Sequence, residues 1–136
     1  MLARDDGRTW PEAESICKVR EMGHLASLTT KDEIQWATQT LLSITNDRDI
    51  LGRFWLGATD LRISSVYEFV DGLPFRKSIV PWASGEPNRP MDVSYNFCVA
   101  MDPRQGRGQR TTWSDENCFQ VYGYICKTFG ECCCKF

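Results

Sequence analysis

Cysteine is the residue type with the clearest chemical potential in this chain of 136 residues. The seven cysteines are Cys17, Cys98, Cys118, Cys126, Cys132, Cys133 and Cys134. Such a density favours an oxidising compartment, where thiols pair as disulfides. Because the number is odd, at least one thiol stays free, pairs between chains or is capped. No two C-x-x-C motifs occur, so the pattern argues against a structural zinc site.

The rest of the composition excludes several function classes. A single histidine, His24, rules out a three-histidine zinc site and argues against most catalytic triads. No phosphate-cradling glycine motif follows an expected strand, so we expect no enzyme activity. A net charge of −2 gives no basic footprint for nucleic acid. No apolar run approaches the roughly 18 residues that span a bilayer, so no membrane insertion is expected.

The cellular compartment is inferred from the cysteine content and not from a signal peptide. Charged residues throughout residues 1–25 interrupt the apolar core that a signal peptide needs, so none is expected in this chain. The cysteine content still favours a secreted or extracellular protein.

Two segments carry the signals of amphipathic helices. Thr9, Pro11 and Glu12 form a helix start with a capping box, and Gly23 is expected to end this helix. Thr30 and Glu33 repeat the capping pattern before a second helix. Its apolar residues recur at three- and four-residue steps, at Ile34, Ala37, Leu41 and Ile44.

Short strands dominate the remainder of the chain. Apolar runs predict them at 54–58, 67–70, 97–101, 111–113 and 122–126, and residues 24–28 form a short strand or turn-rich link. Residues 71–95 hold four of the six prolines and predict a long loop, a kind of segment that is usually functional. Helices first and strands afterwards indicate the α+β class.

Several motifs, in this order and spacing, resemble the C-type lectin-like domain family from about Trp10 to Lys127. They are Cys17, Gly23-His24-Leu25-Ala26-Ser27-Leu28, Phe54-Trp55-Leu56-Gly57, Asp71-Gly72, Trp82, Gly85-Glu86-Pro87-Asn88, Cys98, Trp113-Ser114-Asp115 with Cys118, and Tyr124-Ile125-Cys126. The resemblance implies two helices and two small antiparallel sheets with a long ligand-binding loop.

The resemblance also implies the disulfides Cys17–Cys126 and Cys98–Cys118, although four cysteines alone allow three pairings. The chain lacks the additional N-terminal cysteine pair of the family's long form, so it resembles the short form.

In sugar-binding members of this family, five side chains hold one calcium ion, and two sugar hydroxyls coordinate the same ion. Calcium suits this role because it accepts six to eight oxygen ligands in loose geometry. The resemblance implies a metal and carbohydrate set of Glu86, Asn88, Asn96, Ser114 and Asp115. The Glu86-Pro87-Asn88 motif resembles that of mannose-type lectins, which implies mannose, fucose or N-acetylglucosamine as the sugar.

Two members of this set depart from the family pattern. Asn96 stands where the family has glutamate, and Ser114 stands where it has asparagine. Both keep an oxygen, but the carboxylates fall from three to two, so we expect weak calcium binding. A second calcium site of some relatives is not expected, since Asp60 alone matches its ligands. The alternatives are a calcium-independent protein-interaction module with a decayed sugar site, and a binder of ice or mineral.

The end of the chain carries a separate expectation. The C-type lectin-like domain is expected at residues 1–128, followed by a cysteine-rich tail at residues 129–136. Cys132, Cys133 and Cys134 cannot all pair among themselves, and we hypothesise an interchain disulfide in a homo- or hetero-oligomer. A thiolate metal site and an unstructured tail are the alternatives. The resemblance implies glycans as partners. Multimerisation would suit this role, because single sugar contacts are weak and multivalency strengthens them.

Overall fold

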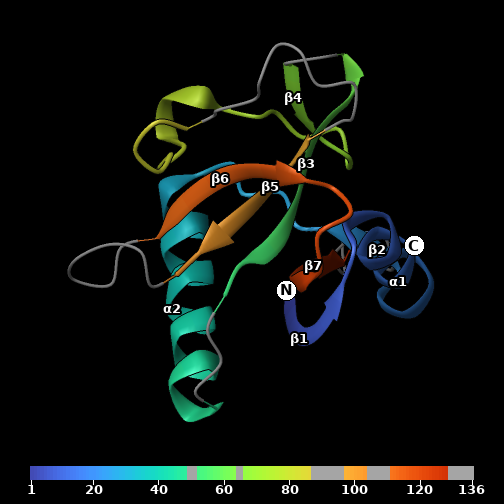
Figure 1. Ribbon diagram of the computed structural model, residues 1–136, viewed down its shortest axis with the longest axis vertical. Coiled ribbons are helices and arrows are strands. Elements are labelled where there is room, and N and C mark those ends of the chain that lie inside the picture. The colour runs from blue at the N-terminus through green and yellow to red at the C-terminus, as the bar shows by residue number, and fades with distance from the viewer. Residues whose placement is uncertain (49–51, 64–65, 87–96, 104–110, 129–136) are drawn as a thin grey trace, which may run out of the picture.

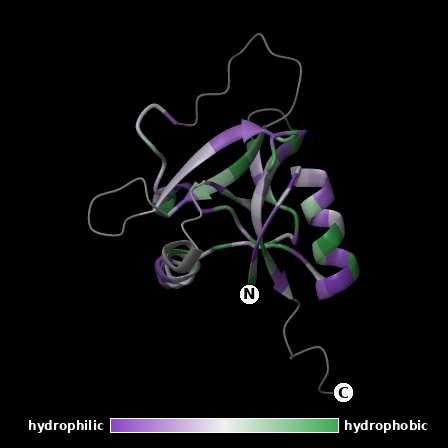
Figure 2. Ribbon diagram, turned by 60° about the horizontal axis from the view of Figure 1, so that its bottom comes forward, coloured by the Kyte–Doolittle hydropathy of each residue, from purple (hydrophilic) through white to green (hydrophobic). Residues whose placement is uncertain are grey.

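The computed structural model describes residues 1–48, 52–63, 66–86, 97–103 and 111–128, and it has the α+β class predicted from the sequence (Figure 1). Its elements are β1 (Leu2–Arg8), α1 (Trp10–Glu21), β2 (Gly23–Leu25), α2 (Lys31–Arg48), β3 (Phe54–Ile63), β4 (Val66–Phe69), the 3₁₀ turn η1 (Lys77–Ile79), β5 (Phe97–Asp102), β6 (Thr112–Asn117) and β7 (Tyr122–Thr128). The two helices lie on opposite sides of the strands, and Figure 2 shows apolar and polar residues in alternate bands along α1. Within the described ranges, no helix is long and apolar enough to cross a membrane.

Both predicted helix starts are confirmed. The Thr9 amide donates to the Glu12 carboxylate at 3.1 Å, and the Glu12 amide donates to Thr9 Oγ1 at 3.4 Å, which completes the capping box of α1. At α2 the Glu33 amide donates to Thr30 Oγ1 at 3.1 Å, while the Glu33 carboxylate accepts from Thr29. The predicted apolar face of α2 is buried at Ile34, Ala37 and Leu41, and the Ile44 side chain lies outside the described residues.

The end of α1 differs from the prediction. Met22, not Gly23, takes the left-handed conformation that ends the helix, with φ of 54°. Gly23 instead begins β2, where an added Cβ would lie 2.2 Å from the carbonyl oxygen of Lys127 in β7. Glycine is therefore required at this position by the close approach of two strands.

The strands join through β3 into one curled sheet, whereas the resemblance implied two small sheets. The order is β1-β7-β3-β5-β6, with β2 on β7 and β4 on β3. β3 and β7 run parallel where Phe54 and Trp55 pair with Gly123 and Tyr124. This parallel contact joins the β1-β7-β2 group to the β4-β3-β5-β6 group, and each group is antiparallel.

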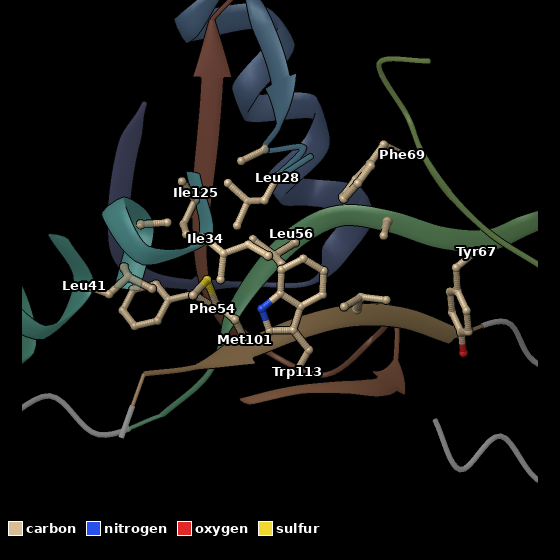
Figure 3. Packing of buried hydrophobic residues seen from close by; sticks show 14 of the residues in the cluster. Leu28, Ile34, Leu41, Phe54, Leu56, Tyr67, Phe69, Met101, Trp113 and Ile125 are labelled. Atoms are coloured by element: carbon tan, nitrogen blue, oxygen red, sulfur yellow. The ribbon is translucent and has the colours of Figure 1, made fainter. Parts of the chain in front are cut away.

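Two buried clusters fasten the helices to the sheet. Figure 3 shows the cluster under α2, where Leu41 lies near Phe54, and Trp113 belongs to the same cluster. The cluster under α1 contains Trp10 and Trp55. The two implied disulfides, Cys17–Cys126 and Cys98–Cys118, are both present and lie in this second cluster.

Lys127 connects the end of β7 to the start of α2. Its Nζ donates to Glu33 Oε2 and to the Ser27 carbonyl, both at 3.1 Å. Burial raises the pKa of Glu33, but hydrogen bonds from Thr29 and Lys127 lower it by more, so the pKa lies below its usual 4.5. The ionised carboxylate therefore stabilises this junction.

Candidate functional site

A short segment after η1 is attached to β6 by main-chain hydrogen bonds. The Trp113 amide donates to the Pro81 carbonyl, and the Ala83 amide donates to the Trp113 carbonyl, each at 2.9 Å. Trp82 and Trp113 form the corresponding parallel bridge. The segment thereby runs beside β6 as a short extra strand.

A turn then brings Glu86 back to this strand. The Glu86 amide donates to the Ala83 carbonyl at 2.9 Å, and Gly85 has a φ of 81°, a conformation that suits glycine. The Asp115 amide donates to Glu86 Oε2 at 3.4 Å. The Glu86 carboxylate, 29 residues away in the chain, therefore contacts the main chain of Asp115 in β6.

Asp115 is held in place on both sides. Asp115 is 3% exposed and pairs with Val99 in the centre of the β5–β6 ladder. The Tyr67 hydroxyl donates to Asp115 Oδ2 at 2.7 Å. Burying a carboxylate is costly without such donors, so this hydrogen bond is part of the site's construction.

Tyr67 is the site residue that sequence reasoning missed. It is predicted only as part of a strand at residues 67–70, and its hydroxyl reaches Asp115 across 48 positions. Its one visible signal is polarity: a buried tyrosine normally finds a hydrogen-bond partner for its hydroxyl.

Of the other three implied ligands, the structure describes only Ser114. Ser114 directly precedes Asp115 in β6, is buried, and pairs with Ala100 of β5. Asn88 and Asn96 lie outside the described residues, as do Cys132, Cys133 and Cys134. The described part of the chain contains no cluster of three or more acidic, histidine or cysteine side chains that could hold a metal by itself.

The donor set present fits calcium better than a softer metal. Glu86 and Asp115 offer carboxylate oxygens and Ser114 a hydroxyl, all hard oxygen donors of the kind that calcium prefers. Asp60, the one match to a second calcium site, is buried and accepts the Phe97 amide at 2.9 Å.

Comparisons with known proteins identify the family. A family model for the lectin C-type domain matches residues 6–128. C-type lectin lectoxin-Lio1 from Erythrolamprus poecilogyrus is 30% identical over 121 residues, which cover 88% of this chain and 68% of that protein. C-type lectin domain family 4 member F from Mus musculus is 29% identical over 126 residues, which cover 90% of this chain but only 20% of that protein.

Solved structures share the fold. Human lithostathine superposes with a TM-score of 0.74 at 23% identity, covering 93% of this chain and 81% of that chain. The trimeric structure of the Kupffer cell C-type lectin receptor Clec4f gives a TM-score of 0.68 at 30% identity, covering 95% of this chain and 78% of that chain. Since the family model also spans nearly the whole described chain, this protein belongs to the C-type lectin domain family.

Proposed function

We propose that this domain binds carbohydrate through one calcium ion, with a preference for mannose, fucose or N-acetylglucosamine. The observation that carries the proposal is the contact of the Glu86 carboxylate with the main chain of Asp115 at β6. Two residues with carboxylates are thereby neighbours, and carboxylate oxygens are ligands that calcium prefers.

The proposed calcium ligands are Glu86, Asn88, Asn96, Ser114 and Asp115. A bound calcium would supply coordination positions for two neighbouring sugar hydroxyls. Glu86 would also accept a hydrogen bond from one hydroxyl, and Asn88 would donate one to it. Because the set contains only two carboxylates, calcium binding is expected to be weak, with a dissociation constant of about 10⁻⁴–10⁻³ M as in other extracellular sites.

A second candidate is a calcium-independent protein-interaction module. Asn96 and Ser114 favour it, since neither is the residue that the family pattern has at that position. The fold itself does not choose: one matching structure is cow CD23 in the presence of a GlcNAc2Man3 oligosaccharide, and another is a calcium-independent antifreeze protein. Ligand binding that resists EDTA would identify this second function.

The chain-level proposals follow from the same family. We place the lectin domain at residues 1–128 and the tail at residues 129–136, in a secreted or extracellular protein without enzyme activity. Cys132, Cys133 and Cys134 would link copies covalently, which adds avidity. A slower band on a non-reducing gel that disappears with reductant would support this linkage, and a monomer under both conditions would refute it.

Retention on a mannose column in calcium, followed by EDTA elution, tests the main proposal. Asp115→Asn and Glu86→Ala should abolish retention. Glu116→Gln is the matched control, because Glu116 is the next residue of β6 but accepts from the Tyr122 hydroxyl at 3.0 Å. Flow-through of the unmodified protein at several millimolar calcium, on mannose and on galactose alike, would contradict the proposal.

A further inference from the structure

A groove of about 380 Å³ lies along β4, close to the candidate site. Its walls come from the end of β3, from β4 and from the segment that follows, and include Arg62, Tyr67, Glu68, Leu73, Pro74 and Phe75. We call it the β4 groove. Of the implied calcium ligands, the structure describes Glu86, Ser114 and Asp115, and none of these three lines the groove.

One wall of the β4 groove is aromatic and firmly held. The Phe75 ring centroid lies 6.1 Å from that of Tyr67, 5.2 Å from that of Phe69 and 6.2 Å from that of Trp82. Phe75 also packs against the buried cluster under α2. Because these rings are fixed by their neighbours, a ligand that lies on them loses little binding energy to ordering of the protein.

The other wall is charged. Arg62 Nε donates to Glu68 Oε2 at 2.8 Å, and a second guanidinium nitrogen donates to the other carboxylate oxygen. The Arg62 side chain is 71% exposed. A guanidinium has five N–H donors, so this pair leaves donors for a ligand hydroxyl.

Tyr67 belongs both to the β4 groove and to the candidate site. Tyr67 is 8% exposed and is one of the residues that line the groove, while its hydroxyl donates to Asp115 Oδ2. Figure 3 shows Tyr67 at the edge of the buried cluster, with its hydroxyl directed away from the other labelled side chains. A single side chain thus separates the two places.

We propose that the β4 groove is a second sugar subsite, which takes the ring glycosidically linked to the calcium-bound sugar. This inference rests on the proposed function. A pyranose has an apolar C–H face, whose partial positive charge is attracted to the negative face of an aromatic ring. It also has hydroxyls at its edge. The Phe75 ring, which is only partly buried, suits the face, and Arg62 and Glu68 suit the hydroxyls.

A purely apolar ligand, such as an acyl chain, fits these walls less well. It would remove water from the Arg62–Glu68 pair without replacing the lost hydrogen bonds, which is unfavourable. A sugar ring replaces those hydrogen bonds. The mixed lining therefore selects a carbohydrate as the occupant.

Calorimetric titration in calcium would test the subsite with methyl α-mannoside and the methyl glycosides of α1,2-, α1,3- and α1,6-linked mannobiose. At least one disaccharide should bind about three- to tenfold more tightly than the monosaccharide, the effect of one net hydrogen bond. Arg62→Ala should remove this advantage and leave the affinity for methyl α-mannoside unchanged. A disaccharide can also gain affinity because either of its two mannose rings can occupy the calcium site. A gain of that kind would not depend on Arg62.

Arg53→Ala is the matched control, since Arg53 is a partly exposed arginine that does not line the β4 groove. Glu68→Gln is a second test variant on the same wall and should weaken disaccharide binding alone. Equal affinities for all four sugars, or an Arg62→Ala effect of the same size on the monosaccharide, would overturn the subsite only. An acyl mannoside that binds more tightly than every disaccharide would also overturn it. Absence of methyl α-mannoside binding would overturn the proposed function as well.

Discussion

The two disulfides should contribute unequally to stability. Cys17–Cys126 joins residues 109 positions apart, and Cys98–Cys118 joins residues 20 positions apart. In the chain-entropy description, these loops correspond to about 4.8 and about 3.3 kcal/mol at 25 °C. Replacing the long bridge by two alanines should therefore cost about 1.5 kcal/mol more than replacing the short one.

Burial does not obscure this difference. All four cysteines are at most 3% exposed and lie in the same buried cluster. Both replacements thus remove two sulfur atoms from a packed interior, and their cavity costs are similar. Alanine is chosen in place of serine because a buried hydroxyl without a partner would add a penalty of its own.

The assay is equilibrium urea denaturation of both double variants, in EDTA so that metal binding makes no contribution. The parent chain should carry Cys132, Cys133 and Cys134 as serines, which prevents exchange between tail thiols and the bridges. Melting temperatures should differ by about 3–6 °C between the variants. Equal losses, or a larger loss for the short bridge, would show that native-state strain or residual structure in the unfolded chain outweighs loop entropy.

Gly23→Ala should lower the free energy of unfolding by about 1–3 kcal/mol, because its Cβ would meet the Lys127 carbonyl oxygen; unchanged urea denaturation would contradict this. Glu33→Gln should make the free energy of unfolding depend less on pH under acidic conditions. Since the folded pKa of Glu33 is lowered, its stabilisation is present above its unfolded pKa and is lost as the pH falls through the folded pKa. Thermal unfolding between about pH 5 and pH 3 should therefore fall more steeply for the unmodified protein, and parallel curves would refute this. Tyr67→Phe should destabilise the protein in EDTA by about 1.5–3 kcal/mol, the value of a hydrogen bond to a charged group, and saturating calcium should restore part of the loss; an unchanged melting temperature in EDTA would argue against the contact with Asp115.

Local signals in the sequence were sufficient for the helices. The Thr9 and Thr30 caps depend on neighbours three residues away, and the buried face of α2 follows from the spacing of its apolar residues. These interactions are complete within one or two turns, so no knowledge of the tertiary structure is needed to predict them.

Features that depend on distant partners were not predictable in this way. The sequence of β1 is mostly polar, and it becomes a strand because Leu2 and Ala3 pair with Cys126 and Ile125 of β7. Gly23 resembles a helix stop until Lys127 is placed beside it. In both cases the conformation is decided by the other strand, and tertiary context overrides local propensity.

The candidate site was predictable in part. The family pattern implies Glu86, Ser114 and Asp115 as ligands, and this role stays a prediction; spacing alone could not bring residue 86 to residue 115. The polarity of Tyr67 does not name its partner, and the β4 groove gave no signal, because a groove is formed by side chains from several elements and exists only once these elements are packed.

Trp113 connects the interior to the candidate site. Its indole is fully buried in the cluster under α2, and its main chain makes both hydrogen bonds that attach residues 81–83 to β6. Its Nε1 is buried without a hydrogen-bond partner among the described residues, so the ring is present for its volume rather than its polarity. Glu86 follows this anchored segment, and Asp115 is two residues beyond Trp113 in the same strand. The contact between the Glu86 carboxylate and the Asp115 amide is therefore positioned by packing in the core, so the proposed site depends on a residue outside its ligand set.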